Sequence, residues 1–254
     1  MTSFAALHVP GRPLLLPNVW EFGFAAALAA AGCPAVGTTS LGVSAAAGLP
    51  DGAPSSRAAT VALAKTLSSL DILVTVDIAD GFSADPAAVA DLVAELAEAG
   101  AVGVNLEDGR ADALAPVEVQ CGLLRAVKGR VPGVFLNART DTHWLGAGGA
   151  DEAVARARAY ASAGADGVFV PGVHDPAEVS ALVTAVEAPL NVLYLPGKVT
   201  VAGLAESGVA RVSLGSGPYR AALGAALAAV DAAREGTESL VAPSYDEVTA
   251  LLPE

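Results

Sequence analysis

The stretch Asp85–Glu107, DPAAVADLVAELAEAGAVGVNLE, contains the unit that decides the fold. Asp85 is a typical helix N-cap residue, and Pro86 suits the first helical position because its missing N–H would have no partner there. The Ala-rich segment that follows predicts a helix that Gly100 ends. The apolar run Val102–Glu107 then predicts a strand buried on both faces. The sequence thus indicates a helix that turns directly into a parallel strand.

The same unit repeats along the chain. Ala-Gly precedes a predicted strand at 31–32, 99–100 and 163–164, and Asp-Pro opens a second helix at 175–176. The predicted strands are continuously apolar, as parallel strands are when helices cover the sheet. They are Leu14–Asn18, Ala35–Ser40, Ile72–Asp77, Val102–Glu107, Gly133–Arg139, Gly167–Pro171, Leu190–Tyr194 and Arg211–Leu214.

Eight strands that alternate with helices over most of the 254 residues predict an α/β fold, a (β/α)8 TIM barrel of parallel strands in a single domain, residues 1–254. A doubly wound sheet is the alternative, but it rarely needs eight evenly spaced units. Residues 243–254 predict one extra amphipathic C-terminal helix, a surface suited to packing on a neighbouring subunit. Its apolar side would carry Tyr245, Val248, Leu251 and Leu252.

Composition excludes several classes of protein. The 27 acidic and 14 basic residues give a net charge of −13, which argues against nucleic acid or an anionic membrane surface as a partner. Two cysteines and an N-terminus without a basic-then-apolar pattern predict a cytoplasmic protein. Residues 22–50 carry no charge, but Pro34 and several glycines interrupt them. They predict a buried helix, a turn and a buried strand rather than a membrane span.

Polar side chains stand where five consecutive predicted strands end, at the edge of a barrel where chemistry gathers. Asp77 and Glu107 end neighbouring strands, and a pair of carboxylates suits Mg2+, which keeps other positions for water and substrate. Arg139 is predicted to bind a substrate carboxylate or phosphonate, and an internal salt bridge with Glu107 is the alternative. Ser40 and the backbone around Leu41 offer donors to a carboxylate.

These residues lie in motifs that together resemble the isocitrate lyase and phosphoenolpyruvate mutase superfamily. The more specific stretches are Gly48–Gly52 (GLPDG), Leu106–Asp108 (LED) and Asn137–Asp141 (NARTD). The resemblance implies a (β/α)8 barrel and a homo-oligomer, a dimer or a tetramer, that exchanges a C-terminal helix. It also implies Mg2+ (or Mn2+) and a small 2-oxo acid or phosphonate substrate, which reacts through an enolate-like pyruvate.

The same resemblance assigns roles to single residues. Asp77 would ligate the metal and Glu107 would hold the metal's waters, while Asp51, Glu107 and Arg139 would form the catalytic set. The residues expected to bind substrate are Trp20, Thr39, Ser40, Leu41, Asn137, Arg139, His143 and Asn191.

The chain also departs from the superfamily pattern. The lyases carry a Lys-Arg-Cys-Gly-His loop soon after the Glu-Asp pair, whereas Gly109 is here followed by RADALAP, so isocitrate and methylisocitrate cleavage are not expected. Cys121 falls within a predicted helix and is expected to be buried. Ala79 stands where a second acid is usual, and Asp80 is the candidate to replace it as a metal ligand. His143 follows a strand end and is the candidate histidine for substrate contact.

The leading hypothesis is therefore a Mg2+-dependent lyase or mutase of a small 2-oxo acid. Decarboxylation or C–C cleavage of a compound such as oxaloacetate is its simplest form, and P–C chemistry of the phosphonopyruvate type comes next. One alternative is a barrel enzyme that binds a phosphorylated ligand at Ser213–Gly217, before the last helix. The other is a degenerate barrel that binds a 2-oxo acid without catalysis.

Overall fold

The structure is a computed structural model, and it describes residues 3–237 and 242–253. Within these residues, nine strands form one parallel sheet whose order is β1-β11-β10-β9-β8-β5-β4-β3-β2. The strands are β1 (Leu14–Leu16), β2 (Asn18–Val19), β3 (Ala35–Thr38), β4 (Leu73–Asp77), β5 (Gly103–Glu107), β8 (Phe135–Arg139), β9 (Gly167–Val170), β10 (Leu190–Leu193) and β11 (Arg211–Ser213).

The sheet closes on itself because its two end strands are halves of one predicted strand. Only Pro17 separates β1 from β2, and proline has no N–H for a ladder bond. β1 pairs with β11, β2 pairs with β3, and the Pro17 carbonyl accepts from Gly37 N at 2.9 Å. The barrel therefore has eight strand positions, which confirms the predicted TIM barrel.

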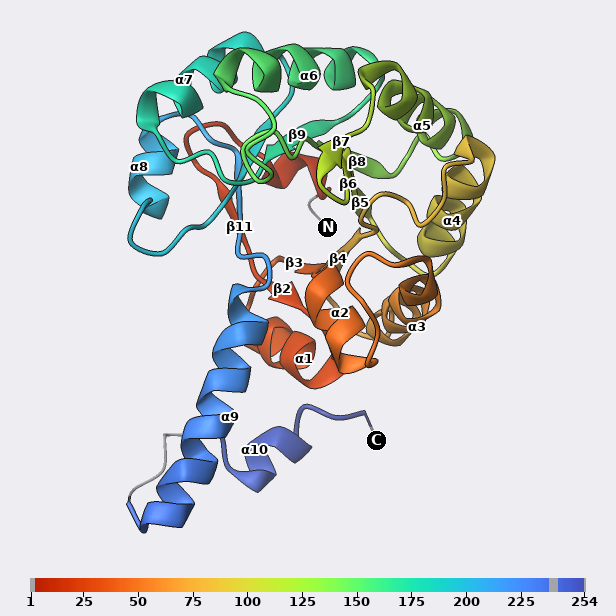
Figure 1. The fold of residues 1–254 in the computed structure, drawn as a ribbon. Coiled ribbons are helices and arrows are strands. Elements are labelled where there is room, and N and C mark those ends of the chain that lie inside the picture. Colours follow the sequence, from red (N-terminus) through yellow and green to blue (C-terminus); the bar gives the residue numbers. More distant parts are fainter. Residues whose placement is uncertain (1–2, 238–241, 254) are drawn as a thin grey trace.

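Helices surround the barrel as a ring (Figure 1). They are α1 (Phe22–Ala30), α3 (Arg57–Leu67), α4 (Pro86–Glu98), α5 (Val117–Arg130), α6 (Ala150–Ser162), α7 (Pro176–Ala185) and α8 (Val201–Glu206), while α2 (Ser40–Ala46) lies on the inner side of α1 and α3 (Figure 1). Short 3-10 turns stand at Ala5–Leu7 and Pro54–Ser56. The predicted N-caps are present: Asp85 accepts from Ala87 N, and Asp175 accepts from Ala177 N. Residues 22–50 fold as α1, β3 and α2, and Cys121 is buried in α5.

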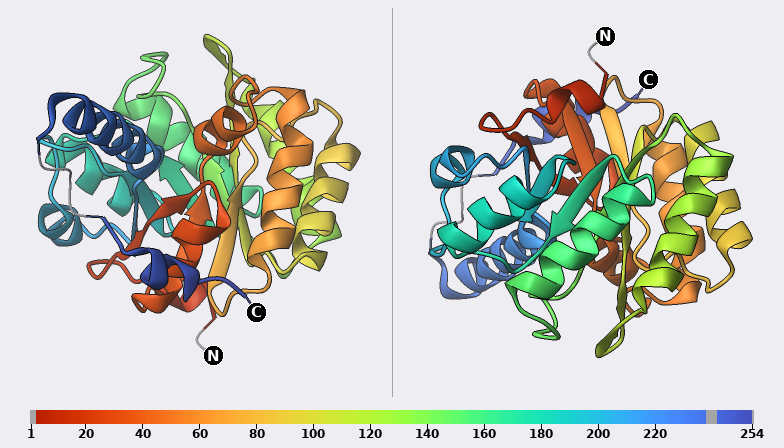
Figure 2. Two further views of the ribbon diagram at one scale, coloured as in Figure 1. Left: turned by 90° about the horizontal axis from the view of Figure 1, so that it is seen from below. Right: turned by 90° about the horizontal axis from the view of Figure 1, so that it is seen from above.

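The two ends of the barrel differ. Aromatic side chains close the end where the strands begin: the His8 ring stacks on Phe135 at 4.3 Å, and Phe4 meets Phe135 edge-on at 5.4 Å. At the opposite end a hairpin of β6 (Gly109–Arg110) and β7 (Ala113–Leu114) projects beyond the helices (Figure 2). The site therefore has to open at the carboxyl ends of the strands.

The C-terminal part of the described chain leaves the barrel. α9 (Gly217–Glu235) projects away from the ring, and α10 (Tyr245–Thr249) lies apart from it (Figure 1). The helix expected over residues 243–254 is thus a short one, and Glu254 lies outside the described residues. Among the described helices, none combines the length and apolar character needed to cross a membrane. The cytoplasmic location stays a prediction.

Candidate active site

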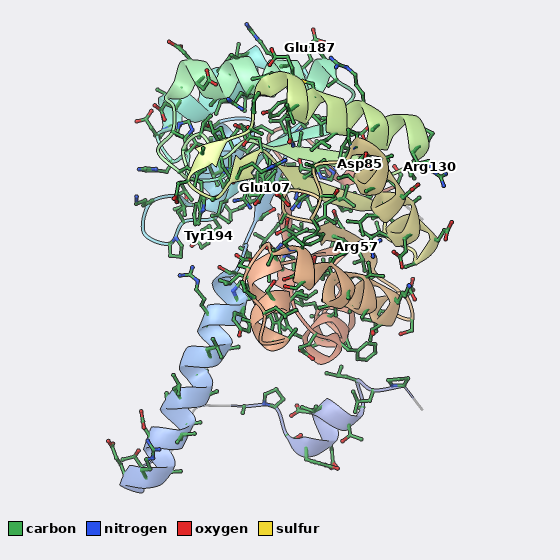
Figure 3. The ribbon with its side chains drawn as sticks, turned by 45° about the vertical axis from the view of Figure 1, so that its right-hand side comes forward. Arg57, Asp85, Glu107, Arg130, Glu187 and Tyr194 are labelled. Atoms are coloured by element: carbon green, nitrogen blue, oxygen red, sulfur yellow. The ribbon has the colours of Figure 1, made fainter. Side chains whose placement is uncertain are left out.

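A cavity of about 260 Å³ opens among the carboxyl ends of the strands. Figure 3 shows Glu107 near the centre of the ring of helices, whereas Arg130 and Glu187 lie at its outer surface. Several residues expected from the sequence line this cavity together, although they come from five separate segments. They are Thr39, Ser40, Leu41, Asp51, Asp77, Glu107 and Arg139.

Asp77 is the last residue of β4 and is almost fully buried. Backbone donors hold its carboxylate: Ser40 N lies 3.3 Å from Oδ2, and Ala79 N lies 3.4 Å from Oδ1. Thr38 Oγ1 accepts from Asp77 N at 2.8 Å. Burial raises the pKa of Asp77, and the charge of Arg139 opposes that shift. The carboxylate is therefore fixed in position and short of positive partners.

Glu107 and Arg139 form the internal salt bridge that the sequence left open. They are register partners of β5 and β8, and Arg139 Nη1 lies 2.8 Å from Glu107 Oε2. Arg139 Nε also contacts Asp141 Oδ1 at 2.6 Å. Burial raises the pKa of Glu107 to about 8, while Arg139 acts in the opposite direction. The acids in turn raise the pKa of Arg139 against the effect of burial, so the guanidinium is a fixed cation.

The charges that line the cavity are unbalanced. Asp51, Asp77, Glu107 and Asp141 all line it, and Arg139 is the cation among the lining residues. No group of three or more His, Cys, Asp or Glu side chains in the described residues is arranged to hold a metal by itself. The donor set instead fits a cation that takes one or two protein carboxylates and completes its shell with water and substrate, which is how Mg2+ usually binds.

Asp108 joins the segments that directly follow β5 and β8. It is fully buried, and its Oδ1 accepts from Asp141 N at 2.8 Å. Its Oδ2 accepts from Tyr160 Oη at 2.6 Å and from Arg156 Nη1 at 3.1 Å. This network fixes the backbone just after Glu107 and just after Arg139. The ion pair between the two side chains is therefore preorganised.

The hairpin of β6 and β7 is anchored by Arg110. Its Nη1 donates to Glu107 O at 2.9 Å and to Gly109 O at 2.8 Å, and its Nε lies 3.5 Å from Asp80 Oδ2. Asp80 therefore faces Arg110 and does not line the cavity, unlike the expected metal ligand. Ala79 has a φ of +47°, and this turn carries the following carboxylate out of the site.

Four residues expected to bind substrate do not line the cavity. Trp20 packs against Phe24 and Tyr219, with ring centroids 5.1 and 5.2 Å apart. His143 Nε2 points to Glu178 Oε2 at 3.2 Å. Asn137 and Asn191 lie in the barrel interior, where Asn137 donates to Asn105 Oδ1 at 2.9 Å and Asn191 donates to Ser213 Oγ at 3.1 Å.

The cavity also contains residues that were not among the expected site residues. Asn105 lies two residues before Glu107 on β5, and Ser213 lies two residues after Arg211 on β11. Residues two apart in a strand point to the same face, so Asn105 shares the face of Glu107. A polar residue within an apolar strand was therefore the sequence signal that could have identified Asn105 as a site residue. The polar and aromatic lining residues outside the expected set are Asn18, Asn105, Asp141, Trp144 and Phe169, together with Ser213 and Ser216 from the segment considered for a phosphorylated ligand.

Comparisons with known proteins find relatives that match nearly the whole chain. The family model described as phosphoenolpyruvate phosphomutase matches residues 4–234. An uncharacterized protein of Mycobacterium tuberculosis H37Rv is 45% identical over 251 residues, which cover 98% of this chain and 96% of the relative.

Two solved structures are similar over nearly the whole chain. One is described as a "putative lyase/mutase" from Burkholderia cenocepacia J2315. It is 35% identical with a TM-score of 0.89, and the match covers 98% of this chain and 93% of that structure's chain. The other is a phosphonopyruvate hydrolase in complex with oxalate and Mg2+. It is 26% identical with a TM-score of 0.82, and the match covers 95% of this chain and 90% of the hydrolase chain.

Proposed function

Because the chain belongs to the phosphoenolpyruvate phosphomutase family, we propose that it is a Mg2+-dependent lyase or mutase of a small 2-oxo acid. The observation that carries this proposal is the placement of Asp77, Glu107 and Arg139 at the ends of three neighbouring strands, around one cavity. Two carboxylates and one guanidinium there offer a cation site and an anion site side by side.

Each residue of the site has its own role in this proposal. Asp77 and Glu107 are the groups that would hold Mg2+, and the cation would supply positive charge to an enolate oxygen as charge develops there. Arg139 is the group that binds a carboxylate or phosphonate group of the substrate, in competition with its ion pair to Glu107. Thr39, Ser40 and Leu41 form the wall against which the other carboxylate lies. Asp51 and Asp141 are the other two acids that line the cavity, and Asp51 is the one that we place beside the substrate.

The cavity favours a small substrate. A volume of about 260 Å³ is near the lower end of the range for ligand pockets and suits an acid of a few carbons. The hairpin of β6 and β7 follows Asp108, where the lyases of the superfamily carry their Lys-Arg-Cys-Gly-His loop. C–C cleavage or decarboxylation of a compound such as oxaloacetate is therefore the first reaction to test, and P–C chemistry of the phosphonopyruvate type is the second.

The test is calorimetric titration with oxalate, a mimic of the pyruvate enolate, with Mg2+ and then with excess chelator. We expect micromolar binding that requires Mg2+ and is lost in Asp77→Asn. The matched control is Asp91→Asn, because Asp91 is an exposed acid on α4 whose partner is Arg130. This control should bind oxalate as the wild type does.

Other outcomes separate the alternatives. Binding of inorganic phosphate without Mg2+ would favour the phosphate-binding barrel, since Ser213, Gly215 and Ser216 line the same cavity just before α9. Oxalate binding without turnover on a panel that starts from oxaloacetate would favour the non-catalytic barrel. Absence of oxalate binding under both conditions would overturn the metal–enolate mechanism.

We further propose that the chain is a homo-oligomer, a dimer or a tetramer. Leu223, Leu227 and Val230 are 49%, 67% and 48% exposed, and their spacing places them on one face of α9. Leu15 of β1 is 46% exposed on the barrel. Light scattering of the wild type and of the double variant Leu223→Asp/Leu227→Asp tests this proposal. A monomeric wild type would refute it.

A further inference from the structure

Arg211 crosses the interior of the barrel. It is the first residue of β11 and is fully buried, yet its Nη2 lies 3.3 Å from Asn105 Oδ1 on β5. In the strand order, β5 is four positions away from β11, on the opposite wall of an eight-position barrel. Arg211 Nε also donates to Ser213 Oγ at 3.1 Å. One side chain thus holds two residues that line the cavity.

This contact determines how the Asn105 amide is oriented. A guanidinium has only donors, so the amide atom that faces Arg211 has to be the oxygen. Asn137 Nδ2 donates to the same oxygen at 2.9 Å. The Asn105 NH2 group must therefore point elsewhere. It has no acceptor among the described residues, and Asn105 lines the cavity beside Asp77, its register partner on β4.

The free NH2 group limits what Asn105 can bind. An amide nitrogen is a donor and does not ligate a cation, so its partner has to be an oxygen that accepts a hydrogen bond. The lining acids Asp77 and Glu107 take their hydrogen bonds and ion pairs from other groups. Asn105 Nδ2 makes no hydrogen bond to a lining acid within the described residues, so an anionic oxygen of a ligand that enters the cavity is an acceptor that this donor can take.

We propose that Asn105 is a further substrate-binding residue, which donates a hydrogen bond from Nδ2 to an oxyanion of the small acid, and that Arg211 is the positioning residue that orients it. The inference rests on the proposed function, because it assigns one more contact to the same site. Because Arg211 already holds the Asn105 amide in place, this donor adds affinity for an anion without the entropy cost of ordering a mobile side chain.

The test compares oxalate affinity, measured by titration calorimetry with Mg2+, between the wild type and Asn105→Leu. We expect affinity to fall by about ten- to a hundred-fold, the range for a lost hydrogen bond to a charged group. Asn105→Asp should also bind more weakly, because it still accepts from Arg211 but has no donor. Thr75→Val is the matched control: Thr75 is buried in β4 without lining the cavity and should keep wild-type affinity.

The role of Arg211 is tested by coupling. Arg211→Met should weaken oxalate binding, and the double variant with Asn105→Leu should bind no more weakly than the worse single variant, because both changes remove the same oriented donor. Additive losses would overturn the positioning role. Unchanged affinity in both Asn105 variants, with Mg2+-dependent binding intact in the wild type, would overturn this inference alone. Absence of oxalate binding in the wild type would overturn the proposed function and the inference together.

Discussion

Arg139 and Glu107 are joined in two ways, as register partners of β8 and β5 and as an ion pair of 2.8 Å between Nη1 and Oε2. The pair sits at the cavity with Asp141 on its other side, 2.6 Å from Arg139 Nε. A ligand carboxylate that engages Arg139, or a cation that engages Glu107, has to compete with this pair. The network around Asp108 holds both strand ends during that exchange.

Removal of Arg139 should be strongly destabilising. Arg139→Leu leaves the half-buried Glu107 and the buried Asp141 without their cation, and we expect it to lower the free energy of unfolding by about 3–5 kcal/mol. The double variant Glu107→Gln/Arg139→Leu should lose less, because it no longer leaves the Glu107 carboxyl without its partner. Urea unfolding measures both. Equal losses in the two proteins would show that the ion pair is not the cause.

Tyr160→Phe should weaken the hydrogen-bond network around Asp108. The Tyr160 hydroxyl donates to the fully buried Asp108 Oδ2 at 2.6 Å, and its removal is expected to lower the free energy of unfolding by about 1–3 kcal/mol. Tyr194→Phe is the control, since the Tyr194 hydroxyl makes no hydrogen bond within the described residues. Comparable stability of the two variants would contradict the assigned role of this network.

Gly103→Ala should disturb the barrel wall. A Cβ at Gly103 would lie 2.9 Å from the Phe135 carbonyl oxygen, a backbone atom that has to shift to make room. We expect a loss of about 1–3 kcal/mol in thermal or urea unfolding, the usual effect of overpacking. At Gly133 a Cβ would meet nothing within 4 Å, so Gly133→Ala should be close to neutral. A neutral Gly103→Ala would refute the tight approach of β5 and β8.

His8 should make the protein less stable in acid. Burial, together with the charge of Arg211, lowers the pKa of His8 to about 4. Between pH 6.5 and 4 the unfolded chain therefore binds a proton that the folded chain excludes, so stability falls as pH falls, by about 1.4 kcal/mol per pH unit from this group. In His8→Phe the slope of stability against pH should be smaller by that amount. The exposed His174→Phe should keep the wild-type slope.

Much of the fold was predictable from local patterns. Asp-Pro helix starts, Ala-Gly helix ends and continuously apolar strands are properties of short segments, so the eight strand positions followed from them. The departure of α9 from the barrel was not predictable in this way, because an apolar helix face does not specify which surface it covers.

By itself, the sequence determined that Asp77, Glu107 and Arg139 would gather at one edge, since parallel strands bring their carboxyl ends together. Only the tertiary structure decided which neighbours share the cavity. The left-handed turn at Ala79 sends Asp80 to Arg110. Asn105 lines the cavity, whereas its register partner Asn137 does not and instead donates to it. Alternation along a strand distinguishes the inward from the outward face, but which inward side chains reach the cavity depends on how the strands tilt and stagger around the barrel.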